Sequence, residues 1–195
     1  MTKVFLGGSR RISRLNVQLR MRLDRIIEKG LPVIVGDANG ADKAFQQYLC
    51  DKSYRNVEVF CSGNICRNNL GNWKQREVPV ASRNRTYAFY ARKDRAMACE
   101  AAVGFMLWDG KSTGTLLNVL RLLGQQKKTV LYNAAEQRFH ELKEFAQWEE
   151  FISKCDGELR KKIEQRATLE AHEHDTPQQS LIPRRGARPA DNAVC

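Results

Sequence analysis

The chain has 195 residues, 42% of them hydrophobic, and a formal net charge of +11. This length fits one domain with appendages, and its longest apolar stretches are too short to cross a bilayer. The first residues enter a predicted strand directly and lack the apolar core of a signal peptide, so we expect a cytoplasmic protein with no membrane partner.

Short apolar runs alternate with amphipathic segments over the first 133 residues. Strands are predicted at 4–6, 33–35, 57–60, 103–107 and 127–132. Apolar strands separated by amphipathic helices indicate a parallel sheet that is covered on both faces. We therefore predict an α/β, Rossmann-like three-layer sandwich with a five-stranded parallel sheet in the order 3-2-1-4-5, followed by C-terminal helices.

Two segments depart from this alternation. Residues 61–85 form a long polar insertion, which is interpreted either as a lid over a ligand or as a loop bonded to itself. Residues 134–166 are predicted to be helical, with a break at Asp156-Gly157, and the composition from 167 onward predicts a disordered tail. The expected organisation is a Rossmann-like domain over 1–133, a helical extension over 134–166 and a tail over 167–195.

An apolar stripe runs along the helical extension. We interpret it as a packing face, with a homodimer contact as the alternative. Its members are Phe139, Leu142, Phe145, Trp148, Phe151 and Ile152.

The six cysteines are expected to be free thiols, because a reducing compartment keeps them so. Cys61 and Cys66 are five residues apart, but no histidine lies near them and no second pair matches. We therefore predict no metal site and no cofactor.

The positive charge is concentrated in two segments. Residues 1–32 and 62–95 each carry eight basic and two acidic side chains. Such clusters attract phosphate groups, on a small ligand or on nucleic acid, although a solvated basic surface has the same composition.

Three glycine-containing loops follow predicted strands: Gly7-Gly8-Ser9-Arg10, Gly36-Asp37-Ala38-Asn39-Gly40 and Asp109-Gly110-Lys111-Ser112-Thr113-Gly114-Thr115. The first backbone N–H groups of a helix are unpaired and the helix dipole is positive there, so a glycine-rich turn into a helix suits an anion. Because the carboxyl ends of parallel strands meet at one edge of a sheet, we expect the three loops to form one site between the first and fourth strands.

The strongest phosphate candidates lie in the third loop, although Ser112 and Thr115 also suit a helix cap. Asp42 is interpreted equally as a ligand contact or as a first-turn acid beside the helix dipole. The predicted ligand-binding residues are Gly7, Gly8, Ser9, Arg10, Gly36, Asp37, Gly40, Asp42, Lys93, Gly110, Lys111, Ser112, Thr113, Gly114 and Thr115.

Over residues 1–132 these motifs resemble the SLOG superfamily of Rossmann-like nucleotide-binding proteins. That superfamily includes the Lonely Guy-type phosphoribohydrolases and the DNA-processing protein A family. The phosphoribohydrolases cleave the N-glycosidic bond of nucleoside 5′-monophosphates with a loop Gly-Gly-x-Gly-Thr-x-x-Glu and an Arg-Lys pair. Gly114 and Thr115 match the Gly-Thr of this loop, whereas Asn118 stands where the family has its Glu.

The resemblance implies a nucleotide or nucleotide-derived ligand, with hydrolysis of an N-glycosidic or phosphoribosyl bond as the reaction. The candidate catalytic carboxylates are Asp37, Asp94 and Asp109, with Arg92 or Lys93 steadying the anion. An amide at Asn118 cannot do the proton chemistry of a carboxylate, which favours a non-catalytic sensor as the first alternative. Nucleic-acid binding through the basic segments is the second.

Overall fold

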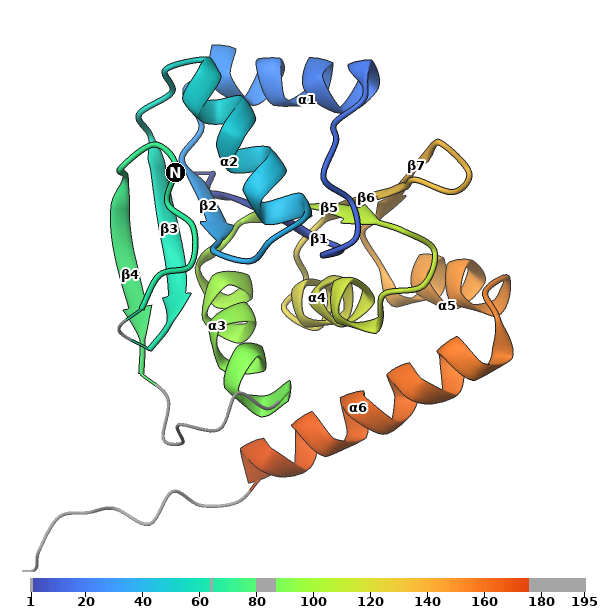
Figure 1. Cartoon of the computed structure of the whole chain (residues 1–195). Helices are drawn as coiled ribbons and strands as arrows, with labels where there is room; N and C mark the ends of the chain where they lie inside the picture. Colours follow the sequence, from blue (N-terminus) through green and yellow to red (C-terminus); the bar gives the residue numbers. More distant parts are fainter. Residues whose placement is uncertain (1, 64, 80–86, 176–195) are drawn as a thin grey trace, which may run out of the picture.

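Seven strands form one sheet in the computed structural model, which describes residues 2–63, 65–79 and 87–175 (Figure 1). The strands are β1 (Val4–Gly8), β2 (Val33–Gly36), β3 (Val57–Ser62), β4 (Lys74–Val78), β5 (Val103–Trp108), β6 (Thr129–Asn133) and β7 (Arg138–Leu142). The helices are α1 (Val17–Glu28), α2 (Ala41–Asp51), α3 (Tyr87–Glu100), α4 (Thr113–Leu123), α5 (Phe145–Ser153) and α6 (Gly157–Asp175). Among these described helices, none combines the length and apolarity that crossing a membrane demands.

The strand order is β4-β3-β2-β1-β5-β6-β7. Its five central strands run parallel in the predicted order, so the predicted α/β class is confirmed. The predicted count of five strands is wrong, because the sheet has one further strand at each edge. β4 pairs parallel with β3 and comes from the polar insertion, and β7 pairs antiparallel with β6.

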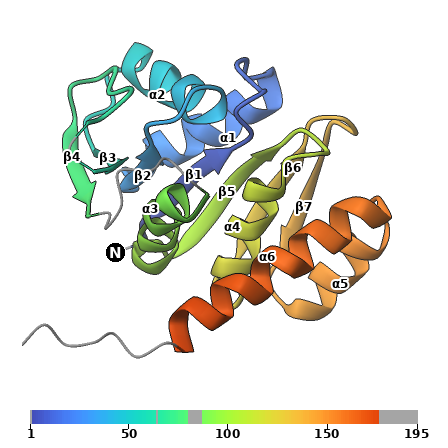
Figure 2. The ribbon, with the colours of Figure 1, turned by 60° about the horizontal axis from the view of Figure 1, so that its bottom comes forward.

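Helices cover both faces of the sheet. Alternate residues of a strand point to opposite faces, so Val4 and Leu6 pack toward α1 and α2, whereas Phe5 packs toward α3 and α4. Figure 2 shows the same layers from below, with α6 running past α4 on the second face. The parallel register brings the ends of β1, β2 and β5 to one edge.

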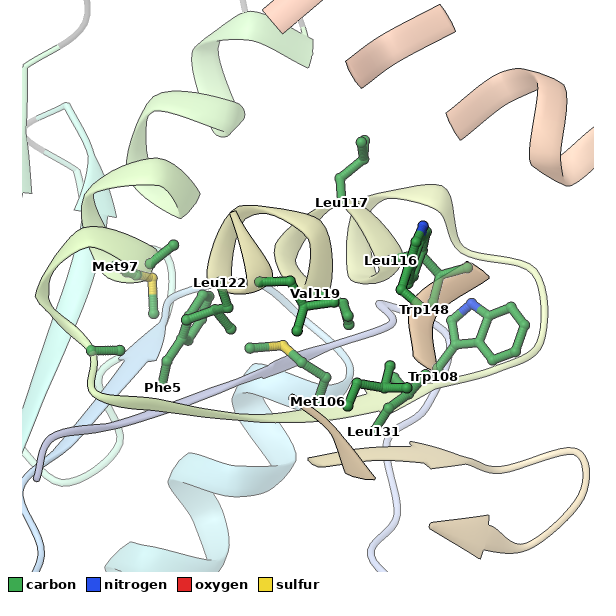
Figure 3. Close-up of a cluster of buried hydrophobic side chains, with 14 of the residues drawn as sticks. Phe5, Met97, Met106, Trp108, Leu116, Leu117, Val119, Leu122, Leu131 and Trp148 are labelled. Atoms are coloured by element: carbon green, nitrogen blue, oxygen red, sulfur yellow. The ribbon is translucent and has the colours of Figure 1, made fainter. Parts of the chain in front are cut away.

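The core beneath α4 is closely packed (Figure 3). Leu122 is fully buried and lies over Gly104 of β5, where an added Cβ would approach the Leu122 methyl group to 2.4 Å. Phe5, Met106 and Leu131 fill the same layer. This layer seats α4 on the sheet and therefore fixes where its N-terminus lies.

The region after β6 differs from its prediction. Residues 134–166 are not helical throughout, because 138–142 form β7. Its residues alternate across the sheet: Phe139 packs on the Tyr132 ring on one face, and Leu142 joins the core on the other. The break at Asp156-Gly157 is confirmed, since α5 ends at Ser153 and α6 begins at Gly157.

The predicted tail begins too early. α6 continues through 167–175, and residues 176–195 lie outside the described part of the chain. The apolar stripe mostly packs inward, with Leu142, Trp148 and Phe151 buried, although Phe145 is half exposed. The homodimer alternative stays a prediction.

Two cysteines are not free thiols. Cys61 at the end of β3 and Cys66 in the insertion form a disulfide, so that part of the cysteine prediction is wrong. Cys50, Cys99 and Cys155 are free, and Cys195 lies outside the described residues. In the sequence, the only indication of this disulfide was that the two cysteines are five positions apart, a spacing that permits a bridge but does not require one.

Replacing Leu122 with Ala should lower the free energy of unfolding by about 2–5 kcal/mol, because it leaves a cavity between α4 and the sheet. Met21→Ala on the exposed side of α1 is the control and should cost less than about 0.5 kcal/mol. Urea unfolding followed by circular dichroism measures both. Equal losses would show that α4 is not seated as described.

Candidate functional site

A cavity of about 970 Å³ opens at the carboxyl edge of the sheet. Residues from all three glycine loops line it: Gly7 to Arg10 after β1, Ala38 after β2, and Gly110 to Thr115 after β5. The predicted convergence of the loops on one hollow is thus observed. Whether they bind a ligand stays a prediction.

Ser9 joins these loops through its backbone. Its N–H donates to the carbonyl oxygen of Leu107 on β5 at 2.8 Å, and its carbonyl accepts from the N–H of Ala41 on α2 at 3.0 Å. The residue is buried. The first loop is therefore fixed to both its neighbours, and the edge of the sheet presents one connected surface.

The third loop is shaped by side chains at its start. Asp109 Oδ1 accepts hydrogen bonds from the N–H groups of Lys111 at 3.1 Å and Ser112 at 2.7 Å. Gly110, which follows Asp109, has φ +81° and so allows the tight turn. Burial opposes the charge of Asp109, but these N–H bonds outweigh it and lower its pKa. Trp108 is buried and its Nε1–H donates to the carbonyl oxygen of Ser112 at 3.1 Å. Asp109 thus holds the loop and does not line the cavity.

The N-terminus of α4 faces the cavity without a side-chain cap. Ser112 stands at the N-cap position, but its side chain accepts no N–H of the first turn and instead bonds the Thr115 hydroxyl at 2.7 Å. An added Cβ at Gly114 would meet nothing within 4 Å. The first turn of α4 therefore leaves open space beside unpaired donors, which is the geometry that accepts an anion.

Below the loops lies a buried cluster of charges. Lys93 of α3 is 3% exposed, and its Nζ lies 3.0 Å from Asp37 Oδ1 and 3.9 Å from Asp42 Oδ2. A Cβ on Gly36 would come within 2.7 Å of this amine and 2.2 Å of the Asp42 carboxylate. Gly36 therefore makes room for the ion pair, and it does not line the cavity.

The pKa values of the two aspartates of this cluster are shifted in opposite directions. Burial alone would raise the pKa of Asp37, but the hydrogen bonds from Arg67 and the charge of Lys93 hold it far below its usual range. Burial raises the pKa of Asp42 to about 6, against the nearby Lys93 charge and with the help of Asp94. Asp42 lines the cavity and Asp37 does not.

The insertion closes over Asp37. Arg67 donates to both carboxylate oxygens, from Nε at 2.9 Å and from Nη2 at 2.7 Å, and the Asn68 side chain donates to the Asp37 carbonyl oxygen at 2.7 Å. The Asn69 side chain donates to the carbonyl oxygen of Trp73 at 2.8 Å and accepts from the N–H of Trp73 at 3.0 Å. The Asn69 bonds lie within the insertion, whereas Arg67 and Asn68 anchor it to the loop after β2. None of the described residues of the insertion lines the cavity.

The Tyr90 ring links the insertion to the cavity wall. The guanidinium of Arg10 lies 4.7 Å from its centroid and that of Arg67 lies 5.0 Å from it. Tyr90 and Arg10 both line the cavity. Their positions therefore depend in part on where the insertion holds Arg67.

The outer wall is formed by α6, which the sequence did not connect with the site. Leu159 is buried against the α4 side of the core, and Lys162 and Arg166 line the cavity. The Arg166 guanidinium also donates to the Thr113 hydroxyl. Only the tertiary arrangement reveals this wall, because the residues lie about 50 positions beyond the third loop.

Asn118 lies on the wall made by α4. Its side-chain oxygen accepts from Arg121, which also pairs with Glu170 of α6. This short network fastens α6 to α4. The Asn118 side chain is therefore engaged in a structural network.

The predicted site residues divide into two groups. Of the four predicted catalytic residues, Asp94 lines the cavity, whereas Asp37 and Asp109 support the loops and Arg92 is exposed and bonds the Pro79 carbonyl oxygen. Predicted ligand residues that line it are Gly7, Gly8, Ser9, Arg10, Asp42, Lys93, Gly110, Lys111, Ser112, Thr113, Gly114 and Thr115; those that do not are Gly36, Asp37 and Gly40. Gly40 has φ +84° and packs against the Arg10 backbone, so its role is also in the scaffold.

The fold and this edge-of-sheet cavity define a Rossmann-like α/β protein. Among solved structures, the chain is similar to DNA processing protein A from Helicobacter pylori, described for its single-stranded DNA binding mode. The TM-score is 0.54 at 13% identity, over 87% of this chain and 81% of that one, which is a likeness of fold. No family model matches the sequence, and no curated protein matches it.

Asp42 should give the stability an unusual pH dependence. Its pKa is higher in the folded chain, at about 6, than the unfolded value of about 3.9. Its contribution to the free energy of unfolding is therefore full below about pH 4 and is lost as the pH rises through about 6. Asp37 has the opposite sign, because its contribution is present above about pH 4 and is lost as the pH falls.

Urea unfolding of the wild-type chain and of Asp42→Asn between pH 4 and 7 measures this difference. As the pH rises from 4 through about 6, the wild-type chain should lose free energy of unfolding relative to Asp42→Asn. Curves that stay parallel would contradict the buried position of Asp42, and carboxyl carbon NMR would then locate its midpoint directly.

Proposed function

We propose that this protein binds a nucleotide or a nucleotide-derived ligand at the carboxyl edge of the sheet, with a phosphate group over the first turn of α4. The observation that carries the proposal is the open, uncapped N-terminus of α4 within a cavity lined by all three glycine loops. Helix N-termini with glycine at the point of approach are suited to phosphate.

Charge and size support the same ligand class. Arg10 and Arg11 lie on one side of the cavity, Lys111 on the loop, and Lys162 and Arg166 on α6. Pockets for small ligands span roughly 300–1,000 Å³, and this cavity lies at the upper end of that interval. A ligand that is anionic at one end and larger than free phosphate fits both features.

Hydrolysis of an N-glycosidic or phosphoribosyl bond of the ligand is the reaction that this site would carry out if the protein is an enzyme. A buried Asp42 and a more accessible Asp94 both line the cavity, so two carboxylates are available there for acid or base chemistry. Asn118 offers no such chemistry. The non-catalytic sensor is therefore the form of the proposal that needs the fewest assumptions.

Single-stranded nucleic acid is a second candidate. The specific observation that favours it is the number of basic side chains that line the cavity, and the protein of similar fold from Helicobacter pylori is described for its single-stranded DNA binding mode. Its phosphates would use the same α4 N-terminus as the phosphate of a free nucleotide. The two candidates differ in how far the contact extends beyond the cavity.

A carboxylate placed over α4 should compete with the ligand phosphate. Gly114→Asp should weaken the binding of a nucleoside 5′-monophosphate at least about tenfold relative to Gly114→Asn, because the two side chains have the same size and differ in charge. Isothermal titration calorimetry measures both variants, and the matching unphosphorylated nucleoside serves as ligand control. Equal affinities for the Asp and Asn variants would place the phosphate elsewhere.

If single-stranded DNA passes through the cavity, Lys162→Glu should weaken the binding of a labelled oligonucleotide more than Lys161→Glu. Both substitutions change the net charge equally, but only Lys162 lines the cavity. The affinity should also fall steeply with salt, with a logarithmic slope of about −0.7 for each phosphate neutralised. Fluorescence anisotropy gives both quantities. Absence of binding at low salt would remove this candidate.

A further inference from the structure

The Cys61–Cys66 disulfide lies beside the site without being part of it. Cys61 is fully buried at the end of β3, and Cys66 is half-buried. The next residue along the chain is Arg67, which binds Asp37 through its side chain and through its backbone N–H at 3.2 Å. The bridge therefore restrains the residue immediately before the main contact between the insertion and the charge cluster.

Two parts of the insertion are held differently. Residues 68–70 are fixed by Gln46 of α2, whose side chain donates to the Asn68 carbonyl oxygen at 3.2 Å and accepts from the Leu70 N–H at 3.0 Å. At the start of the insertion, the Gly63 N–H donates to the Val78 carbonyl oxygen at 3.0 Å. Cys66, directly before Arg67, is tied to β3 by the disulfide.

From this arrangement we propose that the Cys61–Cys66 pair is a thiol–disulfide switch that controls the Arg67 side of the cavity. In the disulfide form Arg67 is held on Asp37 and against the Tyr90 ring, whose other neighbour is Arg10 of the first loop. In the dithiol form the segment around Cys66 is released, and Arg67 loses its fixed position. The cavity wall formed by Tyr90 and Arg10 then loses one of its supports.

The reductant is a dithiol, either a small molecule or a protein of the dithiol oxidoreductase class. Its thiolate attacks the sulfur of Cys66, which is the more accessible of the two, and the sulfur–sulfur bond breaks with Cys61 leaving as a thiolate that takes up a proton. The second thiol of the reductant then displaces Cys66. Two electrons pass to the protein, which ends with two thiols, while the reductant ends as a disulfide.

A metal site is the competing interpretation of the same residues. The sulfur atoms of Cys61 and Cys66 and a carboxylate oxygen of Asp37 lie within 4.8 Å of one another. Asp37, however, already binds Arg67 and Lys93, so its oxygens are occupied by two cations. The geometry therefore favours redox chemistry between the sulfurs over a third ligand to a metal.

The first test does not depend on the proposed nucleotide function. The full chain is treated with dithiothreitol or left oxidised, alkylated with iodoacetamide and weighed by intact mass spectrometry. Reduction should add two alkyl groups, and hydrogen exchange of residues 65–67 should become about tenfold faster while residues 68–73 change little. Cys61→Ser and Cys66→Ser should exchange like the reduced protein, and Cys99→Ser, at an exposed free cysteine, should respond like the wild type.

The second test measures coupling to the cavity and rests on the proposed function. The oxidised chain should bind a nucleoside 5′-monophosphate about fivefold or more tightly than the reduced chain. Arg67→Lys should keep the disulfide but lose this difference, because lysine cannot bind the carboxylate with two donors.

Several outcomes would overturn the proposal. They are the absence of the disulfide after mild oxidation, equal exchange in the two forms, or tight zinc binding by the reduced chain that is lost in Cys66→Ser. If the chain binds no nucleotide, the mass and exchange results still decide the switch, so its failure is distinguishable from failure of the proposed function. If nucleotide binds equally in both forms, the coupling to the cavity is wrong.

Discussion

The ion pair between Asp37 and Lys93 is the constraint on which the site depends. Both side chains are almost completely removed from water, and a buried charge without a partner is strongly destabilising. Asp37 belongs to the loop after β2 and Lys93 to α3, while Arg67 binds the same carboxylate from the insertion. One carboxylate therefore fixes three segments that are distant in sequence. The wall of the cavity formed by α3 takes its position from this contact.

Much of the fold was predictable from periodicity and composition. The five central strands are apolar runs between amphipathic helices, and this pattern indicates a parallel sheet, for which the Rossmann-like strand order was the expected one. The edge strands were missed for a physical reason. Lys74 to Val78 is mostly exposed and polar, so it forms a strand through backbone bonds to β3 without an apolar signature. Arg138 to Leu142 is short, and its alternation was hidden inside a longer apolar stripe.

The site was predictable at the level of loops but not of individual roles. Glycines after three strands indicated the edge of the sheet correctly, because strand direction alone brings those loops together. Which carboxylates face the cavity depends on side-chain partners. Asp109 binds the N–H groups of its own loop, and Asp37 is enclosed by Arg67 and Lys93, so neither reaches the cavity. The wall contributed by α6 required long-range packing, which no local pattern encodes.

The outermost strands have a consequence for how copies of this chain can meet. An unpaired strand edge is a template on which another chain can extend the sheet. On β4, however, Lys74 and Arg76 project charge at that margin, where both pair with Glu58 of the neighbouring strand. Among the described residues β4 is the outermost strand on this side. Exposed charged side chains along such an edge disfavour its pairing with a second copy of the chain, and so reduce the tendency to aggregate.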